Sequence, residues 1–230
     1  MKPENFMRVN RRKFAFIICV NNEQFFKECE IYIQRLKVPA GFTIEIIPIY
    51  DAKSICEGYN RGMASTDAKY KIYMHQDVYI MNPNFLCDIL TVFKQNWKIG
   101  LIGMVGSPVL PPDAIMWDDI RVGNLYSFRN EDVDFDGYEY RKEEGYDVVE
   151  AVDGLLMVTK ADLRWRDDLF DGWDFYDISQ SFEFRNKGYQ VVVPEQRKPW
   201  CAHEDGVILN LWNGYDKYRH IFLDNYKLTQ

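Results

Sequence analysis

The first half of this chain alternates short apolar runs with amphipathic segments, and this alternation limits the possible folds more than any other feature. The run KFAFIICV has the length of a strand, and in the segment after it the apolar residues recur at helical spacing. Repeated alternation of this kind predicts βαβ units and a mostly parallel sheet covered by helices. The predicted strands are residues 13–20, 42–50, 70–80 and 98–107, separated by predicted helices at residues 21–38, 51–65 and 82–96.

The regular alternation ends with the fourth of these strands. Residues 111–147 lack a clear period and are rich in Trp, Tyr, Asp and Gly, so we expect long loops with short elements that cover a substrate. Strand character returns at residues 147–163, and residues 170–194 predict a helix followed by a strand. The aromatic, amphipathic tail at residues 200–227 predicts a final helix packed on the body.

The composition supplies a core and restricts the partners. A hydrophobic content of 47% and an aromatic content of 16% suffice for a packed interior. The net charge of −7 argues against nucleic acid or an anionic membrane as the main partner. Residues 113–177 hold 19 Asp and Glu against 7 Lys and Arg, which leaves the rest near +5 (21 minus 16). This division fits anionic-ligand binding in one part and metal or hydroxyl chemistry in the other, with a solvated acidic surface as the alternative.

The five cysteines are odd in number and widely spaced, and no two form a C-x-x-C pair. This spacing excludes a standard zinc ribbon and argues against a disulfide framework, so we expect reduced, mostly buried thiols and a cytoplasmic location. The run FAFIICV is too short to span a bilayer, and no small-residue cleavage site follows it. We therefore expect no transmembrane segment.

Polar residues stand at the ends of three predicted strands. Asn21 follows the first strand, Asp51 follows the second, and His75-Gln76-Asp77 lies within or after the third. Ligands of open α/β sheets bind at the carboxyl ends of strands, so this placement predicts a site. The fingerprints G-x-G-x-x-G, G-x-x-x-x-G-K-[ST], G-x-S-x-G and H-E-x-x-H are absent from the sequence.

Two residues are candidates for holding a divalent cation. A cation bound together with a diphosphate needs few protein ligands, because the phosphates and water supply the remaining oxygens. Asp77 at a strand end and His203 in the segment WCAHEDG could provide them, and a nitrogen ligand favours Mn²⁺ over Mg²⁺. The alternatives are an ordinary loop carboxylate and a hydrogen-bonded surface histidine.

Asp177 is the candidate general base, because the first turn of a helix facing a cleft can hold a carboxylate rigidly near a substrate. The alternative makes Asp174 the helix N-cap and places Asp177 at the third helical position, where the helix dipole favours an acid. Asp153 and Gly154 interrupt a strand, which suggests either close approach of a ligand or a bulge. Trp173 could stack on a sugar ring or pack in the core.

Taken in order, these segments resemble family-2 glycosyltransferases of the GT-A fold, and most closely the subgroup typified by a streptomycin-biosynthesis protein. The resemblance covers residues 13–206. It rests on a first strand ending in VNN, on YDAKSICEGYNRGMASTDAKYKIYMHQDV, on VDGLLMV, and on FYDISQSFEFRNKGYQVVVP followed by AHEDG. It implies a single domain, residues 1–230, with a Rossmann-like, mostly parallel central sheet flanked by helices, an acceptor-side insertion and a C-terminal helical tail.

The resemblance also implies that different parts of the chain have different functions. Residues 13–107 would form the nucleotide-binding half, residues 108–206 the acceptor and catalytic half, and residues 207–230 the helical tail. The activity implied is transfer of a sugar from a nucleotide-sugar donor, a UDP-sugar being the first expectation, to an acceptor hydroxyl, with inversion and a divalent cation (Mn²⁺ or Mg²⁺). The acceptor is expected to be a carbohydrate.

Individual positions match the family motifs. The residues matching nucleotide-binding positions are Asn21, Asp51, Asn60 and Gly62. Asp77 matches the last acid of the D-x-D motif, His203 a late metal-contacting histidine, and Asp177 the base of the E-D motif. In the implied mechanism, Asp177 takes the proton of the acceptor hydroxyl in a single in-line displacement.

The sequence also departs from the family pattern. His75 and Gln76 occupy the first two positions of D-x-D, Tyr176 stands where the family often has Glu, and Ser179 where a second Asp is common. These departures allow a metal-poor enzyme, or a non-catalytic module that binds a nucleotide-sugar or carbohydrate. A nucleotidyltransferase is a weaker alternative, because CVNNEQFF lacks the glycine- and lysine-rich phosphate loop expected after the first strand.

Overall fold

The computed structural model describes residues 8–118, 120–129, 132–138, 145–204 and 214–228. Within these residues, the strands form a seven-stranded sheet in the order β2-β1-β3-β11-β5-β12-β9 and a smaller sheet in the order β10-β6-β7-β13-β4, with β8 added to β7. No helix in the described ranges is long and apolar enough to cross a membrane.

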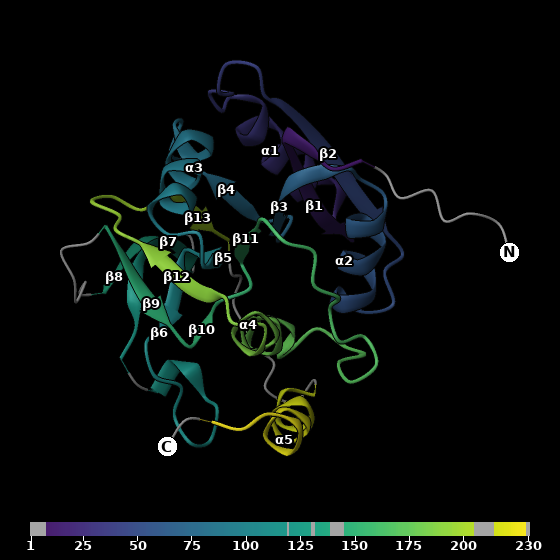
Figure 1. Cartoon of the computed structure of the whole chain (residues 1–230), viewed down its shortest axis with the longest axis vertical. Helices are drawn as coiled ribbons and strands as arrows, with labels where there is room; N and C mark the ends of the chain where they lie inside the picture. The colour runs from purple at the N-terminus through teal and green to yellow at the C-terminus, as the bar shows by residue number, and fades with distance from the viewer. Residues whose placement is uncertain (1–7, 119, 130–131, 139–144, 205–213, 229–230) are drawn as a thin grey trace, which may run out of the picture.

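The first three strands of the alternating first half form one end of the larger sheet (Figure 1). Strand β1 pairs in parallel with both β2 and β3, as two consecutive βαβ units require. Each connecting helix is capped by its sequence: Asn22 accepts from two backbone N–H groups at the start of α1, and Ser54 accepts from one at the start of α2. These elements are β1 (Asn10–Val20), α1 (Glu23–Gln34), β2 (Thr43–Tyr50), α2 (Ile55–Ala64) and β3 (Ala68–Met74).

The predicted fold class, a mostly parallel sheet flanked by helices, is confirmed. Strands β2, β1, β3, β5 and β12 run in one direction, whereas β11 and β9 run antiparallel to their neighbours. Strand β11 lies between β3 and β5 and so joins the two halves of the chain in one sheet. The elements completing the larger sheet are α3 (Phe85–Gln95), β5 (Ile99–Gly103), β9 (Tyr146–Val149), β11 (Leu156–Thr159) and β12 (Gln190–Pro194).

Alternate side chains of the central strands enter two different cores. On β1, Phe14, Phe16 and Ile18 pack with α1 and α3, whereas Ile17 packs with α2. Both faces of the strand are therefore buried, which explains why its sequence is a continuous apolar run instead of an alternating one. The helices cover both sides of the sheet, as expected for this fold class.

Two predicted strands each break into two strands of different sheets. The prediction of one strand at residues 70–80 is wrong: β3 ends at Met74, and β4 (Val78–Ile80) belongs to the smaller sheet. Similarly, residues 98–107 divide into β5 and β6 (Val105–Ser107). The polar residues His75-Gln76-Asp77 mark the first break. The apolar pattern continues through the second break at the buried Met104, so hydrophobicity carries no signal for that change of sheet.

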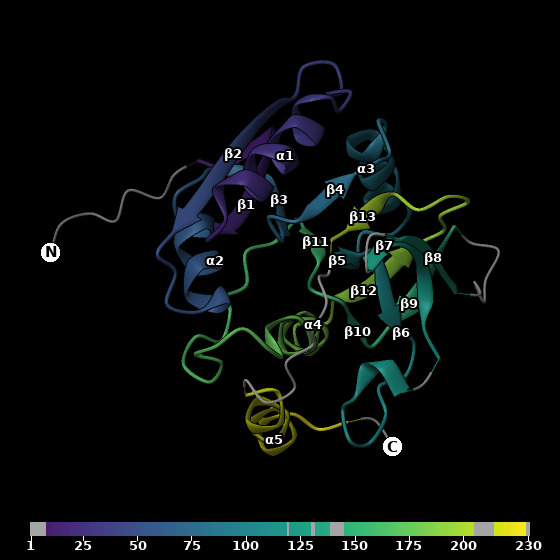
Figure 2. The same ribbon diagram turned by 180° about the vertical axis from the view of Figure 1, so that it is seen from behind.

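The expectation of loops with only short elements at residues 111–147 is also wrong. A 3₁₀ turn is followed by the long antiparallel pair β7–β8. Asn124 and Ser127 are buried on β7, and the Asn124 side chain donates to the Gln196 carbonyl. Polar side chains facing inward remove the alternation that normally identifies a strand. The remaining elements of this region are η1 (Met116–Asp118), β7 (Val122–Arg129), β8 (Asp132–Tyr138), β10 (Ala151–Val152) and β13 (Cys201–His203), and Figure 2 shows β13 between β4 and β7.

The last two helices pack against each other. Helix α4 (Tyr176–Asn186) has Phe175, with φ of 60°, as its N-cap residue, so the alternative of Asp174 as the cap is wrong. Helix α5 (Tyr215–Asn225) places Phe222 against Phe175 and Phe182 of the preceding segment. This packing agrees with the expected tail helix, although residues 207–213 of the predicted tail lie outside the described residues.

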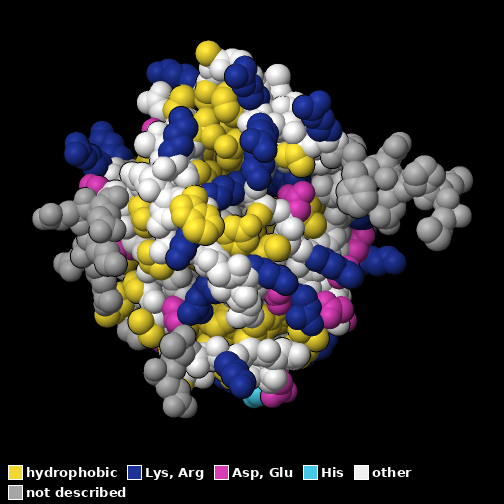
Figure 3. Space-filling model, in the orientation of Figure 1, with side chains coloured by type: hydrophobic (Ala, Val, Ile, Leu, Met, Phe, Trp, Pro, Cys, Tyr) yellow, Lys and Arg dark blue, Asp and Glu magenta, His cyan; other side chains and the backbone are white. Residues whose placement is uncertain are grey.

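The acidic excess of the chain is not evident on the face shown in Figure 3. Lys and Arg side chains are scattered over this face, with hydrophobic side chains between them and few Asp or Glu.

Candidate active site

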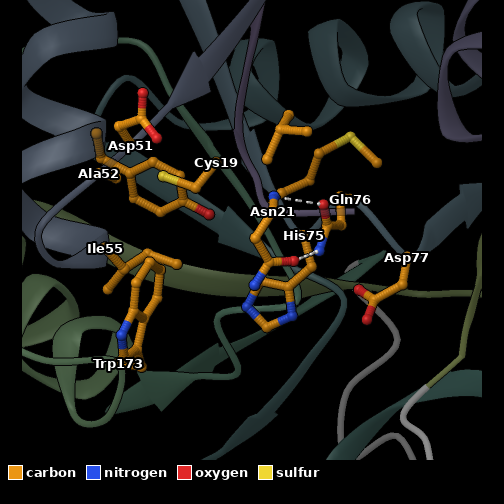
Figure 4. Close-up of a pocket in the computed structure, with 12 residues that line it drawn as sticks. Cys19, Asn21, Asp51, Ala52, Ile55, His75, Gln76, Asp77 and Trp173 are labelled. Carbon is orange, nitrogen blue, oxygen red and sulfur yellow. Dashed lines mark hydrogen bonds between the residues drawn. The ribbon is translucent and has the colours of Figure 1, made fainter. Parts of the chain in front are cut away.

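A cavity of about 460 Å³ opens at the carboxyl ends of β1, β2 and β3 (Figure 4). This is the edge of the sheet where the polar strand-end residues were expected to meet. Its volume is in the range of small-molecule sites. The residues lining it are Cys19, Val20, Asn21, Asp51, Ala52, Ile55, Tyr59, Met74, His75, Gln76, Asp77 and Trp173.

Gln76 fastens the end of β1 to the end of β3. Its Oε1 accepts from the backbone N–H groups of Asn21 and Asn22, both at 2.9 Å, and its Nε2 donates to the Asn21 side chain (Figure 4). The middle residue of the His-Gln-Asp sequence therefore holds the rim of the cavity in place, while its two neighbours remain available for other contacts.

The opposite wall carries Asp51 and Trp173. Asp51 has a φ of 54°, in the left-handed region, so the chain turns sharply at the end of β2 and leaves the side chain exposed. Trp173 comes from the segment before α4 and is 52% exposed, although it lines the cavity. An exposed indole beside a cavity is available to contact a ligand, and this position does not fit the alternative of a core tryptophan.

His75 and Asp77, which line the cavity, form a cluster with His203, which is absent from the described lining. One ligand atom of each lies within 4.8 Å of the others. Asp77 Oδ1 is 3.6 Å from His203 Nε2, and His203 Nε2 is 3.5 Å from His75 Nδ1. The antiparallel pairing of β4 with β13 brings His203 to Asp77, because Val78 and His203 are register partners.

The donor set of this cluster fits a divalent cation. Asp77 Oδ1 is buried and accepts no hydrogen bond within the described residues. Burial alone would raise the pKa of Asp77, but the imidazoles of His203 and His75 outweigh it and lower the pKa. Burial and the neighbouring His203 lower the pKa of His75. An ionised carboxylate beside a neutral imidazole is a combination that divalent metals bind.

Asp177 lies beyond the cavity lining and is held by the main chain. Its Oδ2 accepts from Gly154 N–H at 2.9 Å, and its Oδ1 accepts from Ile178 N–H at 2.8 Å. Burial, reinforced by the Asp153 carboxylate, raises the pKa of Asp177 to about 7. A carboxylate with a pKa near neutrality suits general-base catalysis. The adjacent Tyr176 links this residue to the cluster, because its hydroxyl is 2.5 Å from His75 Nε2.

Asp153 and Gly154 occupy the turn before β11. The Asp153 side chain accepts from Leu155 N–H at 2.7 Å, and Gly154 supplies the N–H that Asp177 accepts. A Cβ at Gly154 would collide with the Tyr176 ring. In the described structure, this glycine is required for the close approach of α4, and neither residue lines the cavity.

Asn60 and Gly62 are also absent from the described cavity lining. Asn60 exchanges two hydrogen bonds with the Trp165 main chain, and a Cβ at Gly62 would collide with Ile17 on β1. Both residues thus have packing roles between α2 and its neighbours. Their match to a nucleotide-binding motif is compatible with a role in positioning α2 under the cavity.

Several residues that shape the cavity were not predicted. Cys19, Ile55 and Tyr59 line it. Cys19 is the next-to-last residue of β1, while Ile55 and Tyr59 lie in the first turns of α2. The only sequence signal for their role is that they lie near the end of a predicted strand. Many residues near these strand ends share that position, so it does not single out the lining residues.

Together, a sheet of this topology and a cavity at its carboxyl edge with a carboxylate–imidazole cluster define an α/β domain of the GT-A class. The model of the glycosyltransferase-like family matches residues 15–226, and the chain belongs to this family, a family 2 glycosyltransferase domain. No curated protein is significantly similar in sequence.

Two solved structures of TarS agree with the fold. Staphylococcus aureus TarS 1–349 in complex with UDP matches with a TM-score of 0.52 and 11% identity over 94% of this chain and 67% of that one. Staphylococcus aureus TarS matches with a TM-score of 0.53 and 11% identity over 94% of this chain and 40% of that one. A mutant Drosophila β-1,4-galactosyltransferase 7 in complex with manganese, UDP-Gal and xylobiose has a TM-score of 0.49 and 14% sequence identity, with 95% of this chain and 77% of that chain covered.

Proposed function

We propose that the protein is an inverting glycosyltransferase that moves a sugar from a nucleotide-sugar donor to an acceptor hydroxyl. The observation that carries the proposal is the cluster of His75, Asp77 and His203, of which His75 and Asp77 line a cavity at the carboxyl edge of the sheet. Membership in the glycosyltransferase-like family supports the reaction class. Within this family, we propose that the protein belongs to the subgroup typified by a streptomycin-biosynthesis protein.

The donor would lie across the cavity, with its nucleotide near Asn21 and Asp51 and its diphosphate toward Asp77 and His203. UDP is the proposed nucleotide, because TarS, which shares the fold, binds UDP. Trp173 could stack on a sugar of the donor or acceptor. A divalent cation bound at Asp77 and His203 would offset the negative charge that develops on the leaving diphosphate.

Asp177 is the proposed base. Its carboxylate accepts the proton of the acceptor hydroxyl while the hydroxyl oxygen forms a bond to the anomeric carbon and the bond from that carbon to the diphosphate oxygen breaks. Its two backbone hydrogen bonds hold the carboxylate at one position during this step. Asp153 would support Asp177 by raising its pKa toward neutrality.

We extend the proposal to the organisation of the chain. Donor binding would belong to residues 13–107, acceptor binding to residues 108–206, and the tail would brace α4 within a single domain. A carbohydrate is the proposed acceptor class. A reducing compartment, the cytoplasm, is proposed because all five cysteines are free and three of them are buried.

A second candidate function is a non-catalytic module that binds a nucleotide-sugar or carbohydrate. It is favoured by the replacement of the first D-x-D acid by His75 and of the usual Glu by Tyr176. Incubating the full chain with a panel of UDP-, GDP-, CDP- and dTDP-sugars and Mn²⁺ separates the two. Release of free nucleotide supports the transferase, whereas tight donor binding without any release supports the module and contradicts the proposed function.

A further inference from the structure

Two of the four departures from the family motifs contact each other. His75 stands in place of the first D-x-D acid at the end of β3, and Tyr176 stands in place of the usual Glu at the start of α4. The Tyr176 hydroxyl lies 2.5 Å from His75 Nε2, although the two residues belong to different elements. This contact brings the two residues together next to Asp77 and His203.

We infer that His75 is a third protein ligand of the cation, through Nδ1, and that Tyr176 is the positioning residue that orients its imidazole. The inference rests on the proposed function for the presence of a cation between Asp77 and His203. It adds a ligand set of two imidazoles and one carboxylate at a motif that ordinarily supplies carboxylates.

The distances fit such a set. Two neighbouring ligand atoms each about 2.1 Å from one ion are about 3.0 Å apart in an octahedron and about 3.4 Å apart in a tetrahedron. His75 Nδ1 and His203 Nε2 are 3.5 Å apart, and His203 Nε2 and Asp77 Oδ1 are 3.6 Å apart. Small rotations of these side chains would bring the three atoms to bonding distance of one ion.

The contact with Tyr176 is compatible with the tautomer of His75 that coordination needs. A neutral imidazole that binds a metal through Nδ1 carries its proton on Nε2, and this N–H requires an acceptor. In that tautomer, the Tyr176 hydroxyl oxygen would accept the hydrogen bond from Nε2–H. Tyr176 itself is buried and closely packed over Gly154, so its hydroxyl has little freedom to move away.

A metal preference follows from the ligand types. Mg²⁺ strongly prefers oxygen ligands in a regular octahedron, whereas Mn²⁺ and Co²⁺ accept imidazole nitrogen. Two imidazoles and one carboxylate therefore favour Mn²⁺ or Co²⁺. If His75 and Tyr176 were only a structural pair, the site would instead have one imidazole.

Pulsed electron paramagnetic resonance of Mn²⁺ bound to the full chain tests the inference, because it detects ¹⁴N nuclei of coordinated imidazoles without requiring turnover. We expect two imidazoles in the wild type and one in His75→Ala, whose Mn²⁺ dissociation constant should rise at least about 10-fold. Tyr176→Phe keeps the ring but removes the acceptor, so affinity should fall about 10-fold. A single imidazole in the wild type, or an unchanged dissociation constant in a folded His75→Ala, overturns the inference.

Two further variants complete the design. His220→Ala removes an exposed histidine on α5 and should leave the spectrum unchanged. His75→Asp replaces the imidazole with an oxygen ligand. This variant should still bind a divalent cation, but its affinity for Co²⁺ relative to Mg²⁺ should be lower than in the wild type. An unchanged ratio of the two affinities contradicts a ligand role for His75.

The result can be separated from the proposed function. Two coordinated imidazoles without any nucleotide-sugar turnover would support the ligand set and contradict the transferase. Mn²⁺-dependent turnover with only one coordinated imidazole would support the transferase and contradict the ligand set. Absence of Mn²⁺ binding by the wild type overturns the ligand set, and turnover in the presence of a chelator then decides the transferase independently.

Discussion

The Asp77 carboxylate lies 3.6 Å from His203 Nε2, and the pairing of β4 with β13 brings the two side chains together. The two residues are far apart in the sequence. Asp77 lies in the break between β3 and β4, and His203 lies on β13, which follows β12 of the larger sheet. The contact places an imidazole beside a carboxylate that lines the cavity at the carboxyl ends of β1, β2 and β3.

Asp77→Ala should remove the Mn²⁺-dependent part of UDP binding, because it deletes the only carboxylate of the cluster found among the described residues. Calorimetric titration with UDP, with Mn²⁺ or with a chelator, measures this. Asp51→Ala is the matched comparison: Asp51 lines the opposite wall, so its loss should weaken UDP binding in both conditions. Equal UDP affinity of the wild type and Asp77→Ala in Mn²⁺ would exclude Asp77 as a cation ligand.

Asp177→Asn should lower kcat on the order of 100-fold or more, because an amide cannot accept the proton of the acceptor hydroxyl. Donor affinity should change little, since Asp177 does not line the cavity. Asp174→Asn provides the control: it alters a neighbouring acid outside the helix and should leave kcat close to that of the wild type. Near-normal turnover by Asp177→Asn would assign the base to another group.

The activity should also depend on pH through Asp177. Its raised pKa of about 7 means that the carboxyl is protonated, and inactive as a base, at lower pH. At saturating substrate and Mn²⁺, kcat should therefore fall as pH decreases through about 7, approaching a tenfold loss per unit. A kcat that stays constant from pH 8 to pH 5 would contradict the assignment.

Trp173→Ala should raise the KM for donor or acceptor, on the order of 10-fold, because stacking on a sugar is worth up to about 1.5 kcal/mol. Its indole is 52% exposed, so the thermal midpoint should change little. Trp97→Ala is the control, since Trp97 is 78% exposed and lies outside the cavity lining. Equal KM values in the two variants would argue against a ligand contact for Trp173.

Gly62→Ala tests whether this motif residue acts through packing. Alanine usually stabilises a helix relative to glycine by about 0.5–1 kcal/mol. Here the added Cβ would collide with Ile17, so we expect a net loss of about 1–3 kcal/mol in the free energy of unfolding. Urea denaturation measures the loss, and UDP titration well below the unfolding transition should show nearly normal affinity. A stabilised variant that fails to bind UDP would instead show that Gly62 contacts the nucleotide.

Much of the fold could be predicted because its evidence is local. Strand β1 is apolar throughout since both faces are buried, and Asn22 and Ser54 are recognisable caps at helix starts. The positions of Asn21, Asp51 and Asp77 at one edge of the sheet follow from the parallel strand direction. These features depend on short-range sequence patterns, which a single sequence preserves.

Other features required the tertiary structure. The hairpin β7–β8 was missed because inward-facing polar side chains, such as Asn124, obtain hydrogen bonds from distant segments and so hide the strand period. Asn60 matches a nucleotide-binding motif, yet its amide is occupied by the Trp165 main chain. Motif matching cannot distinguish a ligand contact from a packing contact, since both use the same hydrogen-bonding groups.

The order of apolar and polar residues along this chain determined a helix-flanked parallel sheet and the edge at which a ligand would bind. Which side chains meet at that edge was decided by long-range strand pairing and helix docking: β13 brought His203 to Asp77, and α4 brought Tyr176 to His75. Pairing between distant strands depends on the packing of the whole core, and no local pattern in the sequence specifies it.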